Sequence, residues 1–199
     1  MRITAQAKEA TRARILGTAS KRFRTQGFDA TTIRDIAREL NIATGTLFNY
    51  FDSKEEVAVA LAEEAINKAR SEFDRKRPED ATLQEELFLQ ISTQIRCLKQ
   101  VRGCFQPVID SALSMTTLDG GSEIGRRLRN AELECVGEIL HDHGIDAGRW
   151  SMTVPIYWGL YVGVLTFWAG DTSPKQEDTL AMLDQSMKMF VSWLESPEK

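Results

Sequence analysis

The chain of 199 residues has little of the side-chain chemistry on which most enzymes depend. It holds two histidines, His141 and His143, and three cysteines, Cys97, Cys104 and Cys135. The cysteines are odd in number, and their spacing suits neither a disulfide framework nor a zinc site. The two histidines, with an acidic neighbour, offer a metal site as one interpretation, but we favour a solvated helix terminus. The sequence therefore predicts no metal and no cofactor.

Catalytic motifs are also missing. We find no Ser/His/acid order and no glycine-rich phosphate loop, and carboxylate pairs such as Glu55–Glu56 and Glu63–Glu64 fit solvated helix faces. The chain does not open with a charged segment followed by an apolar one, so no secretory signal is expected. We predict that the protein is not an enzyme and, given its free cysteines, that it is cytoplasmic.

One long uncharged run, residues 152–169, raises the question of a membrane span. Pro155 and two threonines dilute the run, and no Lys/Arg cluster flanks it, so we expect a helix of a soluble protein. A helix that is apolar on nearly every face must be covered on both sides. Its own core can cover one side, and a second subunit can cover the other.

Two helices are candidates for a dimer interface. Gly159 and Gly163, four positions apart, would let a second helix approach closely. The last predicted helix, residues 175–195, contributes Leu183, Met187 and Phe190. Together with their counterparts these helices predict a four-helix seam in a homodimer. The alternative is a monomer that buries them internally.

The rest of the chain shows helical spacing and almost no strand pattern. Pro and Gly are few enough to leave long uninterrupted segments. A loop is expected at 116–122, and further helices are expected at 7–26, 54–77, 82–98, 103–115 and 124–144.

Charge is unevenly placed along the chain. Residues 1–54 hold ten Lys or Arg against five Asp or Glu, whereas residues 78–199 hold ten against eighteen, within a net charge of -4. The first part of the chain is therefore basic and the remainder acidic. This distribution predicts that the first part forms a positively charged surface that binds a polyanion.

Residues 27–54 have the pattern of two short helices joined by a tight turn. Thr32 can cap the first helix, with Asp35 completing a capping box. Asn41 suits the left-handed position that ends this helix. The second helix, residues 44–50, turns Leu47 inward together with Phe51. Such a helix-turn-helix can enter a DNA major groove, although a plain helical hairpin would show the same spacing.

The ordered residues of this segment resemble a known signature. The run Thr32-Ile33-x-x-Ile36-Ala37, then IATGTLFNYF at 42–51 and SKEE at 53–56, resembles the amino-terminal signature of the tetracycline-repressor (TetR) family. The resemblance covers about the first third of the chain. Three positions depart from the family pattern, with Asn41 in place of Gly, Ala43 in place of Ser and Phe48 in place of Tyr.

The resemblance implies which residues bind DNA. Those expected to contact the DNA backbone are Thr32, Thr46, Phe48, Tyr50 and Lys54. Those expected nearest the bases are Arg34, Ala43, Thr44, Gly45 and Asn49. The planar guanidinium group of Arg34 has the shape to donate two hydrogen bonds to a guanine base, although Arg34 could equally be a solvated charge on the helix surface.

The resemblance also implies the architecture and the function. We expect an all-α fold of about nine helices, with a three-helix DNA-binding domain at 1–54, a linking helix at 54–77 and a ligand-binding and dimerisation domain at 78–199. The expected function is a ligand-responsive repressor that binds a palindromic DNA operator as a homodimer. A helical adaptor that binds a protein partner is the alternative.

A cavity for an apolar or amphipathic effector is expected among the middle helices. Each aromatic or sulfur-containing side chain there could equally belong to the core. The candidate lining residues are Phe88, Gln94, Cys97, Phe105, Asp110, Met115, Tyr157, Trp158, Tyr161 and Trp168.

Overall fold

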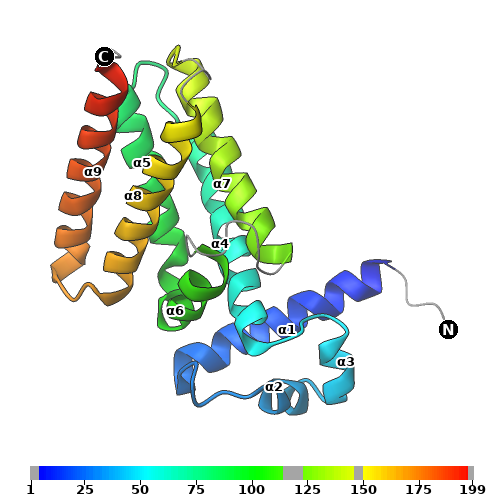
Figure 1. The fold of residues 1–199 in the computed structure, drawn as a ribbon. Coiled ribbons are helices and arrows are strands. Elements are labelled where there is room, and N and C mark those ends of the chain that lie inside the picture. Colours follow the sequence, from blue (N-terminus) through cyan, green and yellow to red (C-terminus); the bar gives the residue numbers. More distant parts are fainter. Residues whose placement is uncertain (1–4, 114–122, 146–149, 197–199) are drawn as a thin grey trace.

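The computed structural model describes residues 5–113, 123–145 and 150–196, and every regular element in these ranges is helical (Figure 1). The all-α prediction is confirmed. The elements are α1 (Ala5–Gln26), α2 (Ile33–Glu39), α3 (Thr44–Phe48), α4 (Lys54–Lys76), α5 (Leu83–Leu98), η1 (Lys99–Cys104), α6 (Phe105–Val108), η2 (Ile109–Leu113), α7 (Glu123–Asp142), α8 (Trp150–Gly170), η5 (Pro174–Gln176) and α9 (Glu177–Glu195).

Helices α1 to α3 form a small unit, here called the head (residues 5–53), at one end of a larger helical body (Figure 1). Helix α4 starts in the head and continues into the body. Ser53 begins it as predicted, because the Ser53 hydroxyl accepts a hydrogen bond of 3.0 Å from the Glu56 amide. The Glu56 carboxylate in turn accepts from the Asp52 amide at 2.5 Å, so the junction between head and α4 is fixed at both ends.

After its first three residues, α4 is buried on every side over residues 57–62. Residues 57–60, Val-Ala-Val-Ala, are each at most 1% exposed, although a helix on a protein surface would leave one face in water. One hydrophobic core runs from Ile15 in the head to Leu194 at the end of α9. The domain boundary at residue 54 thus stays a prediction from the sequence.

The predicted helix 103–115 is broken in the structure. Its residues belong to the 3-10 segment η1, to the short α6 and to the π-helical η2. Pro107 explains part of the break, because proline has no amide hydrogen to donate within a helix. Met115 and the predicted loop 116–122 lie outside the described residues.

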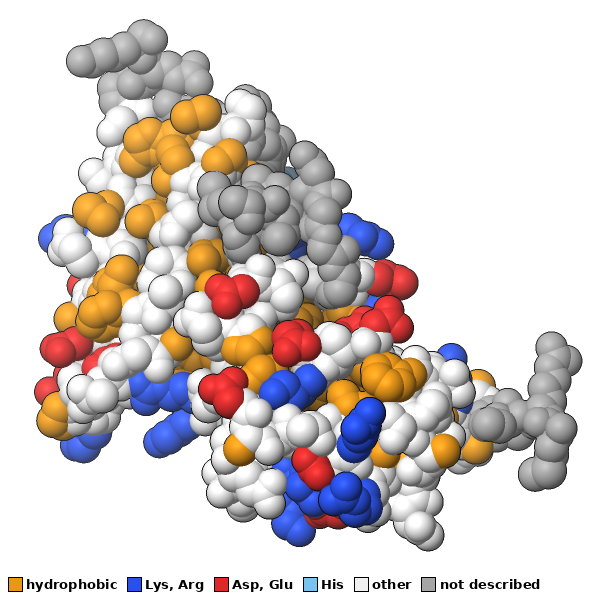
Figure 2. Space-filling model, turned by 60° about the horizontal axis from the view of Figure 1, so that its bottom comes forward, with side chains coloured by type: hydrophobic (Ala, Val, Ile, Leu, Met, Phe, Trp, Pro, Cys, Tyr) orange, Lys and Arg blue, Asp and Glu red, His pale blue; other side chains and the backbone are white. Residues whose placement is uncertain are grey.

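Helix α8 is long and apolar enough to cross a membrane over Ser151–Gly170, but 39% of that stretch is buried within the protein. Its inner face carries four fully buried aromatic side chains, Tyr157, Trp158, Tyr161 and Trp168. Its outer face and that of α9 leave large apolar side chains exposed, and Figure 2 shows such side chains gathered on the upper left of the view. The helix is thus half core and half surface, as the sequence predicts.

Candidate DNA-binding head and the closed core of the body

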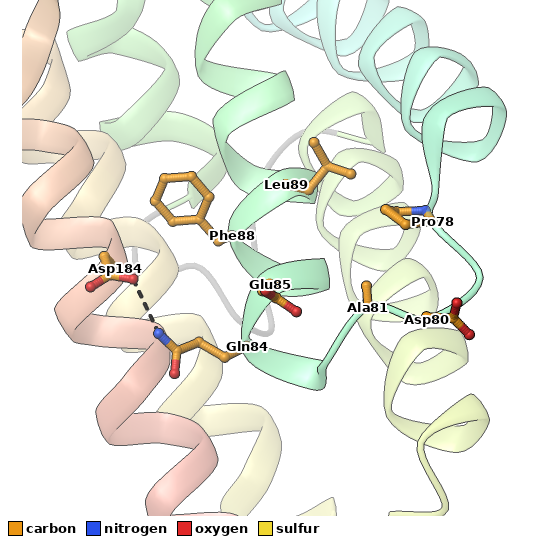
Figure 3. Close-up of a pocket in the computed structure, with 8 residues that line it drawn as sticks. All are labelled: Pro78, Asp80, Ala81, Gln84, Glu85, Phe88, Leu89 and Asp184. Atoms are coloured by element: carbon orange, nitrogen blue, oxygen red, sulfur yellow. Dashed lines mark hydrogen bonds between the residues drawn. The ribbon is translucent and has the colours of Figure 1, made fainter.

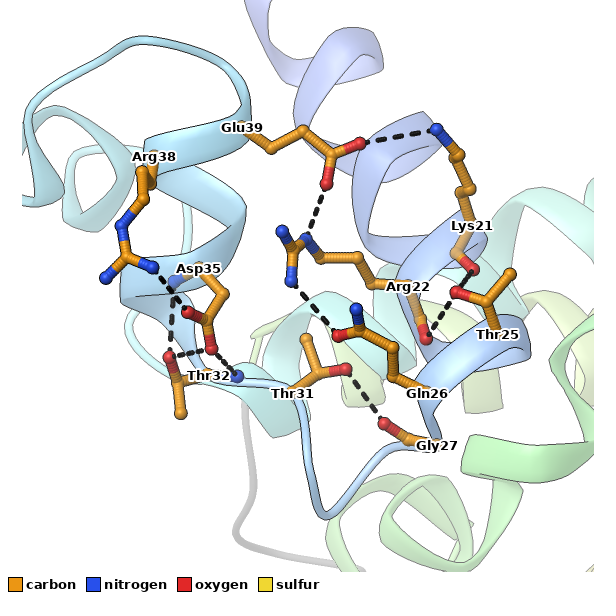
Figure 4. A network of polar contacts seen from close by, with 10 residues as sticks. All are labelled: Lys21, Arg22, Thr25, Gln26, Gly27, Thr31, Thr32, Asp35, Arg38 and Glu39. Atoms are coloured by element: carbon orange, nitrogen blue, oxygen red, sulfur yellow. Dashed lines mark hydrogen bonds and ion pairs between the residues drawn. The ribbon is translucent and has the colours of Figure 1, made fainter.

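The turn between α1 and α2 is held by local hydrogen bonds (Figure 4). The Thr32 hydroxyl accepts from the Asp35 amide at 3.2 Å, and the Asp35 carboxylate accepts from the Thr32 amide at 3.1 Å, so the predicted capping box is confirmed. The Thr32 hydroxyl also donates to the Asp35 carboxylate at 2.6 Å, and this hydrogen bond, together with the one from the Thr32 amide, lowers the pKa of Asp35. The Thr31 hydroxyl donates to the Gly27 carbonyl oxygen at 2.8 Å, and Gly27 has the positive φ of 89° that glycine accepts without strain.

An ion pair clamps α2 onto α1. Arg22 of α1 donates through Nε to the Glu39 carboxylate at 2.6 Å, and Lys21 approaches the same carboxylate at 3.5 Å (Figure 4). The hydrogen bond from Arg22 lowers the pKa of Glu39. Helix α2 is only seven residues long, too short to be stable alone, so this clamp and its buried face fix its position.

The turn between α2 and α3 also follows the prediction. Asn41 adopts a positive φ of 54°, and the next amide, of Ile42, donates to the Ala37 carbonyl at 3.0 Å. The side chains of Leu47 and Phe51 are buried, at 0% and 1% exposed. Helix α3 ends at Phe48, two residues before the predicted end.

The predicted DNA-contacting residues all lie at the surface of α2, α3 and the beginning of α4. The exposed ones are Thr32, Arg34, Ala43, Gly45, Phe48 and Asn49, and the partly buried ones are Thr44, Thr46, Tyr50 and Lys54. Phe48 is 48% exposed, an unusual value for a large aromatic side chain. Figure 2 shows Lys and Arg side chains at the lower end of the molecule, over the head. This end is therefore the candidate nucleic-acid surface.

Lys54 already has partners within the head. Its ammonium group donates to the Phe28 carbonyl oxygen at 2.8 Å and lies 4.1 Å from the centroid of the Phe28 ring. The side chain thus fastens the α1–α2 turn to the start of α4. The phosphate contact predicted for Lys54 is a second role, separate from this structural one.

An ion-pair chain joins the head to the body. Arg127 of α7 donates through Nε to the Glu63 carboxylate of α4 at 3.0 Å. Arg12 of α1 lies 3.7 Å from Glu63 and 3.4 Å from Glu64. The interpretation of Glu63–Glu64 as merely solvated charges is therefore wrong. The partners lie more than 50 residues apart, so no local pattern shows them.

Several predicted effector residues meet around a carboxyl group that the sequence analysis missed. Glu132 of α7 is 1% exposed. It accepts hydrogen bonds from Tyr157 at 2.6 Å and from Gln94 at 2.5 Å. Gln90 donates to its two oxygens at 3.0 and 3.1 Å, and Tyr161 donates to the Gln94 carbonyl at 2.8 Å. We call these five residues the Glu132 cluster.

Other predicted effector residues lie elsewhere. Phe88 lines an outer groove of about 550 Å³ with residues of α5, α9 and the α4–α5 connection (Figure 3). Cys97 lines a separate cleft beside α1. Asp110 is exposed and accepts from Gln106 at 3.0 Å. These three residues do not share a site with the Glu132 cluster.

The aromatic residues of α8 and α6 pack as core. Phe105 meets Trp168 edge to face, with ring centroids 5.2 Å apart, and the Trp158 ring nitrogen donates to the Leu113 carbonyl at 3.1 Å. Arg102 lies 5.5 Å from the Trp168 ring and donates to the Ala169 carbonyl at 3.3 Å. These contacts fasten η1 and η2 to α8.

The space next to Glu132 is closed in this conformation. The cavity between α4, α5 and α7, which Gln90, Gln94 and Glu132 line, measures about 10 Å³. That volume suits one water molecule and no effector. The open cavity expected among the middle helices is therefore not found beside the Glu132 cluster in this conformation.

The predicted dimer residues divide into two groups. Leu183, Met187 and Phe190 are at most 1% exposed within the single chain, so they stabilise the protomer and cannot reach a partner. Gly159 is exposed and Gly163 half-buried, and a Cβ atom added at either position would meet no atom within 4 Å beyond its chain neighbours and the backbone of its own helix. The exposed apolar side chains on these helices are Met152, Phe167, Leu180, Met182 and Met189.

His143 is not the solvated helix terminus that the sequence suggested. Its Nε2 lies 2.6 Å from the Glu86 carboxylate, which is nearly buried and also pairs with Arg77. These contacts tie the end of α7 to α5 and α4. Over the described residues no group of three or more His, Cys, Asp or Glu could hold a metal ion.

The three cysteines are free. Burial raises the pKa of Cys104 and of Cys135 to about 12, so neither thiol is reactive at neutral pH.

The fold and the head together define a class, that of helical regulators with an amino-terminal helix-turn-helix. Residues 15–61 match the family model "Bacterial regulatory proteins, tetR family". The HTH-type transcriptional regulator HbdR of Aromatoleum sp. (strain CIB) is 32% identical over 68 residues, which are 34% of this chain and 30% of that protein. The uncharacterized regulator YfiR of Bacillus subtilis (strain 168) is 28% identical over 74 residues, 37% of this chain and 36% of that protein. The alignments thus span about a third of these curated relatives.

Solved structures match over almost the whole chain. Thermus thermophilus FadR, a TetR-family repressor in complex with lauroyl-CoA, superposes with a TM-score of 0.72 at 21% identity, covering 94% of this chain and 97% of that one. A TetR regulator from Nitrosomonas europaea gives 0.66 at 20% identity, covering 92% and 98%. Residues 15–61 thus match the TetR family model, and the chain as a whole has the fold of these solved regulators. Its relatives are transcriptional regulators rather than enzymes, in agreement with the prediction.

Proposed function

We propose that the protein is a cytoplasmic transcriptional repressor that binds a palindromic DNA operator as a homodimer and is released by a small molecule. The observation that carries the proposal is the surface of α3. Its Gly45 and Phe48 and the flanking Ala43 and Asn49 are exposed, while Leu47 anchors the helix in the core of the head. A short helix presented in this way can lie in a major groove.

Each exposed residue then has a distinct task on DNA. Arg34 is the residue best suited to read a guanine through its two parallel donors. Thr44, Gly45 and Asn49 face the base edges as well. Thr32, Thr46, Tyr50 and Lys54 contact the sugar-phosphate backbone. Phe48, with no hydroxyl, contacts sugar or a thymine methyl group.

Two arguments support a dimer as the form that binds the operator. One helix of five residues reads few base pairs, so two heads related by a two-fold axis are needed to read both halves of a palindrome. The outer faces of α8 and α9 leave Met152 at 59%, Phe167 at 43% and Met189 at 52% exposed, with Gly159 between the first two. We place the dimer contact on these exposed residues and no longer on Leu183, Met187 or Phe190.

Release follows from a shift between two conformations. A ligand that binds an opened conformation of the body more tightly than the closed one lowers the population of the conformation that binds DNA. The lauroyl-CoA bound to the FadR of T. thermophilus supports the idea of a small-molecule effector in a body of this fold. The closed core around Glu132 is the conformation that binds DNA in this scheme.

Sedimentation and selection from genomic fragments test the proposal together. We expect a dimer at micromolar concentration, and recovery of fragments that share an inverted repeat, with binding that weakens as salt rises. A Met189→Glu variant should be monomeric and lose selection, whereas Lys188→Glu, at the neighbouring exposed position, should keep both. A monomeric wild type, or recovery of fragments without a shared sequence, contradicts the proposal and favours the adaptor interpretation.

A further inference from the structure

Glu132 lies where a carboxyl group is costly. It is 1% exposed in the middle of α7, and its neighbours Tyr157 and Tyr161 are fully buried with their rings stacked at 6.0 Å. A carboxyl group buried in this way destabilises a protein unless its partners compensate, and apolar residues of similar size often serve stability better. Such a group in a regulator's body calls for a role beyond packing.

Among the described residues, no cationic side chain is hydrogen-bonded to Glu132. Its partners are the amides of Gln90 and Gln94 and the hydroxyl of Tyr157, all neutral donors. Arg70 is close enough to act on it through space, but its guanidinium donates to the Ala131 carbonyl at 3.2 Å and to Glu138 at 2.7 Å. Burial is the largest influence on the pKa of Glu132, and it raises that pKa.

A second acceptor lines the same cavity without a partner in the described part of the chain. The side-chain carbonyl of Gln90 is buried and accepts no hydrogen bond there, and Gln90 itself is 2% exposed. Buried polar atoms are nearly always paired, because an unpaired one costs free energy. The cavity therefore presents two acceptors, the Gln90 carbonyl and the Glu132 carboxyl group, and can take one more donor.

We propose, on the basis of the function proposed above, that the Glu132 cluster is the recognition end of the effector site and that the effector carries a protonated amine. The ammonium group pairs with Glu132 and donates a second hydrogen bond to the Gln90 carbonyl. The buried rings of Tyr157, Tyr161 and Trp158 lie on the α8 side of the cluster and suit the apolar part of an organic cation.

Entry of such a ligand moves α7. The cavity of about 10 Å³ admits an amine only if α7 separates from α4 and α5. Helix α7 also carries Arg127, which pairs with Glu63 of α4, and Glu63 faces Arg12 of the head. The ion-pair chain thus connects the helix that the ligand displaces to the helix that supports the DNA-binding surface.

The test uses phenylalkylamines from phenylethylamine to phenylhexylamine. Each amine is compared with the alcohol and the carboxylate of the same skeleton, and lauroyl-CoA is a separate arm. Quenching of tryptophan fluorescence and calorimetry of the full chain measure affinity without DNA. We expect at least one amine to bind about tenfold or more tightly than its alcohol, because a charge-assisted hydrogen bond in a buried site is worth that factor.

Two variants test whether Glu132 is the residue that causes the preference for an amine over its alcohol. Glu132→Gln should bind the amine and its alcohol equally, whereas Glu134→Gln, two residues away and exposed on the same helix, should keep the wild-type preference. Circular dichroism confirms that both are folded. An Arg127→Gln variant should bind the amine as the wild type does but release DNA less readily on adding it.

The experiments distinguish a failure of the amine-effector proposal from a failure of the proposed repressor function. If no amine of the series binds better than its alcohol, or if lauroyl-CoA alone binds, the assignment of an amine effector is overturned. A preference that survives in Glu132→Gln overturns it as well. Operator binding by the ligand-free protein is measured in parallel, so its absence would contradict the repressor function without touching the amine result.

Discussion

The buried Glu132 gives a prediction about stability that can be worked out from its contacts. In a Glu132→Gln variant the amide oxygen still accepts from Tyr157, and the new amide nitrogen replaces the oxygen to which Gln90 and Gln94 donate. Once the Gln90 amide turns over, its otherwise unpartnered carbonyl can accept from this nitrogen. The change therefore removes a buried ionisable group and pairs a buried acceptor, while Gln94 reorients. We expect the free energy of unfolding to rise by about 1–4 kcal/mol at neutral pH and above.

The gain should depend on pH. Burial raises the pKa of Glu132, so the folded protein holds that proton more tightly than the unfolded chain does. The corresponding stability is complete below the unfolded pKa and is lost as pH rises through the folded pKa. The groups that face Glu132 are Tyr157 and Tyr161 of α8, Cys135 of its own helix and Arg70 of α4. The first three stay neutral and Arg70 stays charged over this range, so Glu132 alone sets the slope.

Urea denaturation followed by circular dichroism, at about pH 5 and about pH 8, measures the effect. The stabilisation of Glu132→Gln over wild type should be larger at the higher pH, and Glu134→Gln should show little change at either. A variant that is less stable at both values, or a gain that is the same at both, would refute the reasoning about the buried charge. If the protein becomes more stable when Glu132 is removed, the presence of Glu132 is explained by function and not by stability.

The remaining predictions concern the head. Arg34→Ala should relax selection at one base position at a cost of about 1–3 kcal/mol, and an unchanged operator profile would remove Arg34 from base reading. Lys54→Met should weaken binding to all sequences and lower the salt slope by about one, and it should destabilise the head by about 1 kcal/mol through the lost Phe28 contacts. An unchanged salt slope would restrict Lys54 to the structural role. Leu47→Ala should cost about 2–5 kcal/mol of stability by melting α3, and DNA binding with it; full binding would contradict the anchoring role.

The features of the head that could be predicted are local ones. The Thr32–Asp35 capping box, the left-handed Asn41 and the Ser53 cap each depend on residues at most five positions apart. Their geometry follows from short-range sterics and hydrogen bonds, so a sequence pattern carries it. The same reasoning placed the end of α3 two residues too late, because its last turn depends on packing.

The missed features depend on contacts between distant segments. Arg102 donates to the carbonyls of Ala169 and Asp171, almost 70 residues away, and so caps α8. Nothing near Arg102 in the sequence predicts this contact. The predicted dimer residues Leu183 and Met187 failed for the same reason, since which stripe of α9 faces α5 and α8 is decided by the whole body.

Glu132 left a signal that sequence analysis could have used. It lies four residues after Leu128 and three before Cys135, on the stripe that buries α7. A charged residue on an apolar stripe must either leave the core or find partners there. Its partners Gln90, Gln94 and Tyr157 come from two other helices, so the cluster itself becomes visible only in three dimensions.

Hydroxyl-radical footprinting on a DNA fragment selected by the protein tests the central claim most directly. Two copies of α3, presented by heads in a fixed relation, should protect two patches that are related by a two-fold axis, with centres about one helical turn, roughly 34 Å, or a multiple of it apart. A single asymmetric patch, or uniform weak protection along the fragment, would contradict the account.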